Sequence, residues 1–106
     1  MSLIEVKTAD LAGAALDWAV AQVEGQKITP RVVRSKYKPS TSWGHCGRLI
    51  EEYRVSVIYS NEACDPCAWT DSTSSWNGST PLIAACRAIV ASVLGETVSV
   101  PKELLS

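Results

Sequence analysis

The sequence has no apolar run of the roughly 18–20 residues that a helix needs to cross a bilayer. The longest candidate, Leu82 to Leu94, is interrupted by Arg87. The first ten residues, MSLIEVKTAD, place Glu5 and Asp10 where a secretory signal would have a basic start and an apolar run. We therefore expect a soluble protein of the cytosol with no membrane partner.

An excess of charge is also missing. Ten lysines and arginines stand against eleven aspartates and glutamates, so the formal net charge is -1 at pH 7. Such a chain has no long-range field toward nucleic acid, and that partner would have to be drawn by a local basic patch. With 106 residues, 46% of them hydrophobic, and no internal repeat or linker, the sequence predicts a single globular domain over residues 1–106.

Common catalytic motifs are absent, among them G-x-G-x-x-G, G-x-x-x-x-G-K-[ST], G-x-S-x-G and H-E-x-x-H. His45 is the single histidine, and no Ser, Cys or Asp partner for it can be read from its surroundings. The sequence therefore predicts no catalytic residue and no cofactor, and it favours a binding protein over an enzyme.

Four cysteines are present, and two of them, Cys64 and Cys67, form a C-x-x-C pair around an Asp-Pro turn. A zinc site would also need His45 and Cys46, but adjacent residues point apart in an extended backbone. A redox pair of the thioredoxin type lies at a helix N-terminus, whereas the segment that follows here, AWTDSTSSWNGS, has no helical period. We expect no bound metal, and free thiols in a reducing cytosol.

The first helix is expected from Ala9 to about Glu24. Thr8 is a good N-cap, and Gly25 supplies the left-handed residue that commonly follows a helix. The helix is apolar nearly all the way round, with Asp17 as one of its few polar interruptions, so it must be covered on more than one side.

The second helix has the strongest local signals in the chain. Thr80 is the expected N-cap, Pro81 takes the first helical position, and Gly95 ends the helix. Both helices carry a stripe of small residues that favours close packing, either within the chain or between subunits. The stripes consist of Ala12, Ala15 and Ala19 in the first helix, and Ala84, Ala88, Ala91 and Gly95 in the second.

Strands are expected at 3–7, 31–38 and 53–59, where β-branched and aromatic residues gather. Residues 67–71 and 97–100 are candidates for two more short strands, and the segment GRLIEEY fits a helical turn or a strand. The predicted fold class is therefore α+β, with two apolar helices packed on a small, mostly antiparallel sheet of three to five strands.

A basic stripe is the first candidate binding feature. In a strand over 31–38, Arg34, Lys36 and Lys38 share one face at spacings of about 6–7 Å, which suits phosphates. The alternative is that these charges protect an edge strand from pairing with another chain.

Two tryptophans lie in polar, glycine-bearing segments, Trp43 in PSTSWGHCG and Trp76 in STSSWNGS. Such a ring either anchors its loop on the core or presents a stacking surface to a ligand. We expect the functional surface where the basic stripe meets the segment from Ser40 to Glu51. The candidate binding residues are Arg34, Lys36, Lys38, Ser40, Trp43, His45, Arg48, Glu51 and Trp76.

Several segments together resemble the NinX-type proteins of lambdoid phages and their prophages. The similarity departs from the family pattern at Cys46 and Arg48, where Gly and Pro are expected. The resembling segments are Leu11, Gly13 and Ala15 followed by Asp17-Trp18-Ala19-Val20-Ala21, then Tyr37, Pro39-Ser40, Trp43, Gly47, Ile50-Glu51, Asp65-Pro66 with Trp69, and TPLIAACRAIVASVLGETVSVPKEL over residues 80–104.

The resemblance implies a phage or prophage origin and a location in the bacterial host cytosol, without supplying a mechanism. The first hypothesis is a non-enzymatic accessory factor that binds a host or phage protein. The alternative is a small enzyme or ligand-binding domain that uses a pocket between Trp43 and Glu51. A weak nucleic-acid contact, and either a monomer or a homodimer, fit both hypotheses.

Overall fold

The computed structural model describes residues 3–25, 29–58 and 66–105, except for the side chain of Arg34. It contains helices, short 3-10 turns (η) and strands. In chain order they are β1 (Leu3–Lys7), η1 (Thr8–Asp10), α1 (Gly13–Val23), α2 (Pro30–Ser35), α3 (Trp43–Glu52), β2 (Ser56–Ile58), β3 (Cys67–Trp69), β4 (Trp76–Asn77), α4 (Pro81–Leu94), β5 (Thr97–Pro101) and η2 (Lys102–Leu104).

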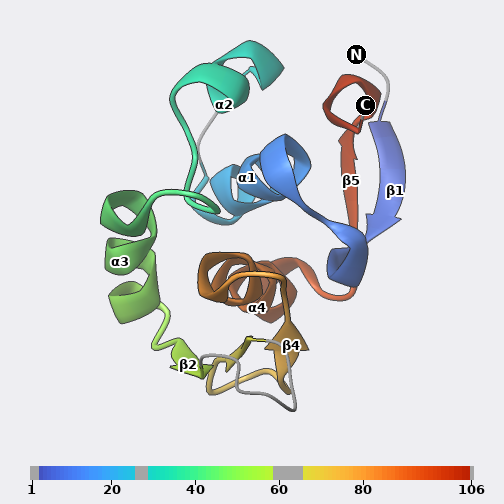
Figure 1. Ribbon diagram of the computed structural model, residues 1–106. Coiled ribbons are helices and arrows are strands. Elements are labelled where there is room, and N and C mark those ends of the chain that lie inside the picture. The colour runs from blue at the N-terminus through green and yellow to red at the C-terminus, as the bar shows by residue number, and fades with distance from the viewer. Residues whose placement is uncertain (1–2, 26–28, 59–65, 106) are drawn as a thin grey trace.

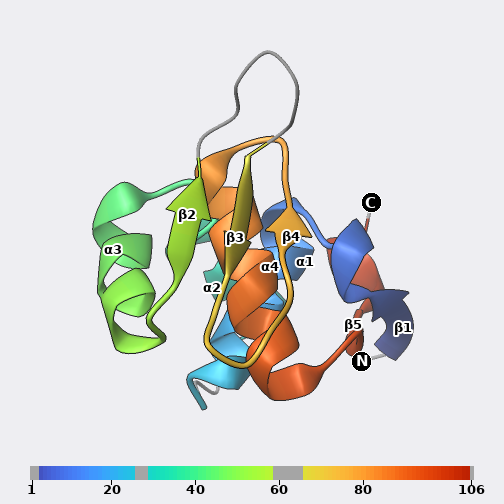
Figure 2. The same ribbon diagram turned by 90° about the horizontal axis from the view of Figure 1, so that it is seen from below.

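The two apolar helices, α1 and α4, pack on each other at the centre of the molecule (Figure 1). A three-stranded sheet, β2-β3-β4, lies against α4, and α3 stands beside it next to β2 (Figure 2). The two-stranded ribbon of β1 and β5 closes another side. The class α+β is confirmed, and the strands form two small antiparallel sheets.

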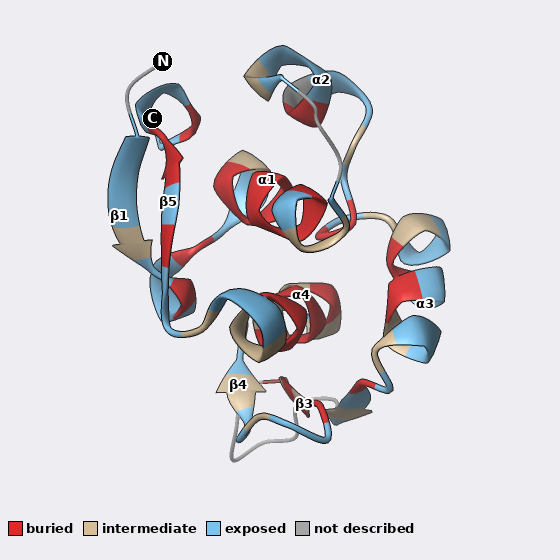
Figure 3. Ribbon diagram, turned by 180° about the vertical axis from the view of Figure 1, so that it is seen from behind, coloured by how far each residue is buried: buried red, intermediate tan, exposed pale blue. Residues whose placement is uncertain are grey.

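The core is built mainly from α1 and α4, whose buried residues face each other and whose ends carry exposed residues (Figure 3). None of the helices in the described part of the chain is long and apolar enough to span a membrane. The largest fully buried aliphatic side chains are Leu11, Leu16, Val20, Val33, Leu49, Ile89, Val90 and Val100.

The α4 prediction is confirmed in detail. The Thr80 side chain accepts a hydrogen bond from the Ile83 N–H, Pro81 occupies the first turn, and Gly95 ends the helix with a φ of 86°. Arg87, the charged residue within α4, ties two segments to the helix. It donates through Nε to the Leu11 carbonyl at 2.9 Å and through Nη1 to the Asn77 carbonyl at 2.7 Å.

The prediction of a strand over 31–38 is wrong, because α2 occupies Pro30–Ser35. Thr29 caps this helix by accepting a hydrogen bond from the Val32 N–H, and Pro30 lies in its first turn. A cap followed by proline is a helix start signal, and here it overrides the strand preference of the β-branched residues that follow.

The remaining boundaries differ from the expectations in smaller ways. The segment GRLIEEY is helical, since α3 runs to Glu52. The strand expected over 53–59 is confined to Ser56–Ile58 within the described residues, because Tyr53 is the C-cap of α3 and Arg54 has a φ of 53°. The predicted strands at 3–7, 67–71 and 97–100 appear as β1, β3 and β5.

The start of the first helix was predicted wrongly. Thr8 begins η1, and α1 starts only at Gly13, after Ala12 as N-cap. Thr8 is fully buried and links the segment after β1 to the segment between α4 and β5. Its hydroxyl donates to the Gly95 carbonyl at 2.7 Å, and its N–H donates to the Glu96 carbonyl at 2.7 Å.

Thr8→Val should lower the free energy of unfolding by about 1–2 kcal/mol, since the isosteric side chain leaves the Gly95 carbonyl without its hydroxyl partner. Thr8→Ser keeps the donor and serves as the matched control. Urea unfolding of the three proteins measures the effect. Equal losses for both variants would mean that shape, and not the hydrogen bond, matters at this position.

Candidate functional site

The residues predicted between Ser40 and Glu51 lie on and just before α3. Trp43 is the first residue of this helix, so the expectation that it lies in a loop is wrong. The Ser42 side chain caps the helix by accepting a hydrogen bond from the His45 N–H at 3.2 Å. Cys46 and Leu49 point into the core and are fully buried, which fixes the helix on the molecule.

The opposite side of α3 is exposed, and we call it the α3 face. At 100° per residue, its members fall within an arc of about 140°. The α3 face consists of Trp43, Gly44, Gly47, Arg48 and Glu51. Its largest side chain, the indole of Trp43, is 52% exposed.

The predicted basic stripe does not exist as a strand face. Arg34 lies within α2, Lys36 is the C-cap of that helix, and Lys38 follows in an irregular segment. A helical backbone sends alternate residues to different sides, so the strand spacing is lost. Lys36 and Lys38 are both exposed, and the side chain of Arg34 lies outside what the structure describes.

A network around Glu24 holds α3 to the end of α1. Arg48 donates through Nη2 to Glu24 Oε1 at 2.5 Å and through Nη1 to Glu52 Oε2 at 2.9 Å. The Tyr37 hydroxyl donates to Glu24 Oε2. The Glu24 side chain is only 7% exposed, whereas that of Arg48 is 58% exposed, so the network runs from the interior to the surface.

Tyr37 also supports His45. Burial and the hydrogen bond to the Glu24 carboxylate raise the pKa of Tyr37, which keeps the phenol protonated as a donor. The imidazole of His45 packs against the Tyr37 ring at a centroid distance of 4.5 Å and an interplanar angle of 80°. His45 therefore serves as a packing residue at the edge of the α3 face.

A cavity of about 350 Å³ is lined by residues of α1, α2 and the segment before α3. Asp17 of α1 lies at this cavity with 4% of its surface exposed, and its Oδ1 accepts a hydrogen bond from the Ser40 N–H at 2.8 Å. Ser40, predicted as a binding residue, is 2% exposed, and its hydroxyl makes no hydrogen bond of acceptable geometry with the described residues. The cavity is lined by Gly13, Ala14, Asp17, Val33, Lys38, Ser40 and Thr41.

Burial raises the pKa of Asp17, and the Ser40 N–H, helped by the nearby hydroxyl dipole, offsets part of that rise. Asp17 was not among the predicted site residues. The available signal was a single carboxylate in an otherwise apolar stretch of helix, which indicates a buried polar contact without naming its partner.

Asp17→Asn should raise stability near pH 7, because its amide oxygen still accepts from Ser40 and the cost of burying a charge disappears. The pKa of Asp17 is higher in the folded than in the unfolded protein, so folding favours the protonated carboxyl. The wild type therefore has its full stability below about pH 4, and it loses stability as the pH rises through the folded-state pKa. The difference in unfolding temperature between variant and wild type should therefore grow with pH. Asp10→Asn, at an exposed position, is the control. A difference that shrinks as the pH rises would contradict the raised pKa.

Trp76 lies apart from the α3 face. It is in β4, across α4 from α3 (Figure 1), and its half-buried ring packs against the core. The expectation that Trp76 lies in a loop is therefore wrong, whereas the interpretation that its ring anchors the segment on the core agrees with the structure. A cavity of about 260 Å³ beside the ring is lined by Lys7, Ala9, Trp76, Glu96 and Thr97.

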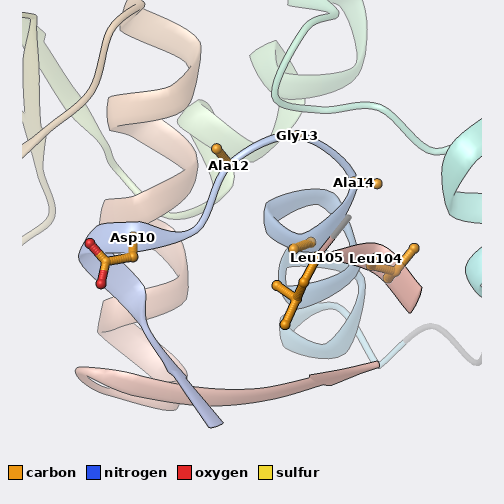
Figure 4. Close-up of a pocket in the computed structure, with 7 residues that line it drawn as sticks. Asp10, Ala12, Gly13, Ala14, Leu104 and Leu105 are labelled. Atoms are coloured by element: carbon orange, nitrogen blue, oxygen red, sulfur yellow. The ribbon is translucent and has the colours of Figure 1, made fainter. Parts of the chain in front are cut away.

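A further cavity, of about 370 Å³, lies at the start of α1 beside the C-terminal η2 turn (Figure 4). Its walls are largely aliphatic, and Asp10 is the single ionisable residue among them. None of the predicted site residues contributes. The lining residues are Asp10, Ala12, Gly13, Ala14, Ala15, Leu104 and Leu105.

Of the C-x-x-C pair, Cys64 lies outside the described residues, and Cys67 begins β3 as a half-buried free thiol. Within residues 3–25, 29–58 and 66–105, no group of three or more His, Cys, Asp or Glu side chains is arranged to hold a metal ion.

Comparison with known proteins gives one family. No curated protein matches the chain. The family model described as Bacteriophage P22, NinX matches residues 7–93, which is more than half of the sequence. The matched range includes α1, α3 with the whole α3 face, and all of α4 except its last residue, Leu94. The chain therefore belongs to the NinX family of phage proteins.

Proposed function

We propose that this phage accessory protein acts by binding another protein through the α3 face and performs no chemistry of its own. The observation that carries the proposal is the Trp43 indole, which stands 52% exposed on a helix whose other side is fixed in the core. Tryptophan and arginine are the residues most enriched among those that dominate binding energies at protein interfaces.

The surroundings of Trp43 favour an interface. Gly47 lies one turn further along α3, and a Cβ placed there would meet nothing within 4 Å. The face beside the indole is therefore flat and open. Arg48 is already held by Glu24 and Glu52, so little side-chain entropy would be lost when a partner covers it.

The charges on the α3 face do not favour binding of a polyanion such as nucleic acid. Arg48 is paired with two carboxylates, and Glu51 adds a negative charge. This arrangement fits a protein partner with an apolar pocket that accepts the indole. We place the interaction in the cytosol of the bacterial host, with a host or phage protein as the partner.

The alternative, a pocket between Trp43 and Glu51 for a small ligand or substrate, has less support. The three cavities described above are lined by other residues, and the nearest of them faces Asp17 and Ser40. A nucleic-acid contact would rest on Lys36 and Lys38, which are exposed but do not form the predicted stripe with Arg34.

The test compares Trp43→Ser with Val93→Ser in affinity capture from phage-infected host cells. Val93 is 53% exposed on α4, so the control removes a similarly exposed apolar side chain from another surface. We expect at least a tenfold loss of the captured partner for Trp43→Ser, in line with about 2 kcal/mol for a central tryptophan, and no loss for Val93→Ser. Circular dichroism should show the same fold for both variants. Equal capture by both variants would overturn the proposal.

A salt titration with single-stranded and duplex oligonucleotides tests the nucleic-acid alternative. Two basic side chains predict a slope of about -2 in the log–log plot of affinity against salt, and the slope should disappear when Lys36 and Lys38 become Glu. Binding with that behaviour would move the function away from a protein partner, whereas absence of binding at low salt supports the α3 face.

A further inference from the structure

Two buried thiols lie side by side where α3 packs on α4. The Sγ atoms of Cys46 and Cys86 are 3.9 Å apart, although the residues are 40 positions apart in the sequence. Both residues are 0% exposed and both are free cysteines. Their helices are neighbours in space (Figure 1). A disulfide holds its sulfur atoms about 2.0 Å apart, so an approach of about 2 Å, shared between the two side chains, separates this contact from a bond.

We propose that Cys46 and Cys86 form a thiol–disulfide site, which a low-molecular-weight disulfide of the glutathione type oxidises to an intramolecular bond between α3 and α4. The C-x-x-C pair, which the sequence makes conspicuous, is not part of this site. The site is formed by two residues that no sequence motif connects.

The reaction proceeds by two thiol–disulfide exchanges. The Cys46 thiolate attacks one sulfur of the oxidant, which forms a mixed disulfide and releases one glutathione thiolate. The Cys86 sulfur then loses its proton and attacks the Cys46 sulfur, which releases the second glutathione. The protein loses two hydrogens and two electrons, and one glutathione disulfide becomes two glutathione thiols.

The contact itself sets the order of the two steps. The contact between the two sulfur atoms lowers the pKa of Cys46 and raises the pKa of Cys86. Of the two thiols, Cys46 therefore loses its proton more readily, and it lies on α3, the helix that has to move, so it reacts first. Cys86 is the resolving thiol, and its proton leaves only when the bond between the two sulfurs forms.

Access for the oxidant requires α3 to move. This helix is ten residues long, its outer face is exposed, and within it only Cys46 and Leu49 are fully buried. Elements with few buried contacts open locally at lower cost than the whole fold. A transient opening of α3 exposes Cys46 together with the facing side of α4, and the disulfide then adds a covalent link to the packing that holds α3 in the closed state.

The experiment uses the full chain with Cys64→Ser and Cys67→Ser, so that Cys46 and Cys86 are the only thiols. After incubation with glutathione disulfide, titration should show the loss of both thiols. Trypsin cleaves after Arg48 and Arg54, so the two cysteines fall on different peptides, and these should be recovered as one linked pair. The unfolding temperature should rise by roughly 10 °C and return to its starting value on reduction.

Adding Cys86→Ser to this variant gives the matched control, which should form at most a glutathione adduct at Cys46 and gain no thermal stability. The reference is the same two-thiol protein unfolded in urea, where glutathione disulfide should oxidise both thiols. The proposal is overturned if, at the same concentration of glutathione disulfide, the folded protein keeps both thiols or carries only glutathione adducts. Wild-type protein gives a second measurement. Chymotryptic cleavage after Trp69 and Trp76 separates Cys67 from Cys86 and identifies the partner of Cys46.

Discussion

Alanine at Gly78 is expected to destabilise the protein by about 3 kcal/mol or more. A Cβ at this position would lie 2.5 Å from the Ala84 nitrogen and 3.0 Å from the Ile83 carbonyl carbon. Both atoms belong to the backbone of α4 and cannot rotate away. The Gly78 N–H also donates to the Pro66 carbonyl at 3.1 Å, so any shift that relieves the clash weakens the sheet.

Gly47→Ala is the matched control for this prediction. Gly47 lies within α3, and an added Cβ there meets nothing within 4 Å. Alanine should raise the free energy of unfolding by up to about 1 kcal/mol, as in other exposed helix positions. Urea unfolding measures both variants. If Gly78→Ala is no more harmful than Gly47→Ala, the close approach of Gly78, just after β4, to the backbone of α4 is not a constraint on the fold.

Ala88→Leu should destabilise the protein by roughly 1–3 kcal/mol through overpacking. Ala88 is completely enclosed on α4, which packs against α1, α3 and both sheets. Alanines on both central helices, Ala15 and Ala19 on α1 and Ala84 and Ala88 on α4, are at most 2% exposed. A larger side chain therefore has to displace a neighbouring element.

Val93→Leu, a change at an exposed position of α4, should alter the stability by less than about 0.5 kcal/mol and controls for the introduction of leucine. Thermal unfolding and the solution mass are measured together. Unchanged stability of Ala88→Leu, combined with loss of an oligomer, would assign the small residues to a contact between subunits instead of the packing within the chain.

The helix that was predicted best has its signals next to one another in the sequence. Thr80, Pro81 and Gly95 mark both ends of α4 without help from the rest of the fold. At α2 the prediction followed the β-branched residues and was wrong, because Thr29 and Pro30 before them begin a helix. The start of α3 was missed because Gly44 and Gly47 are poor helix formers, and the burial of residues on its inner side compensates for them.

The parts of the candidate site that could not be predicted all depend on contacts between distant segments. Asp17 meets Ser40, Glu24 meets Arg48, and Cys46 meets Cys86 only after the helices have packed. A single sequence carries no local signal for such pairs. The division of the strands into two sheets has the same cause, because β1 pairs with β5 from the other end of the chain.

The pairing of β1 with β5 has a consequence for the order of events during protein synthesis. Leu3 lies opposite Pro101 and Lys7 opposite Thr97, so β1 cannot pair until more than 90 further residues, up to β5, have been synthesised. Until then Leu3 and Ile4 have no strand beside them, whereas α1 and α4 can already pack. We expect closure of this ribbon to be the latest and slowest step of folding, since it joins the most distant parts of the chain.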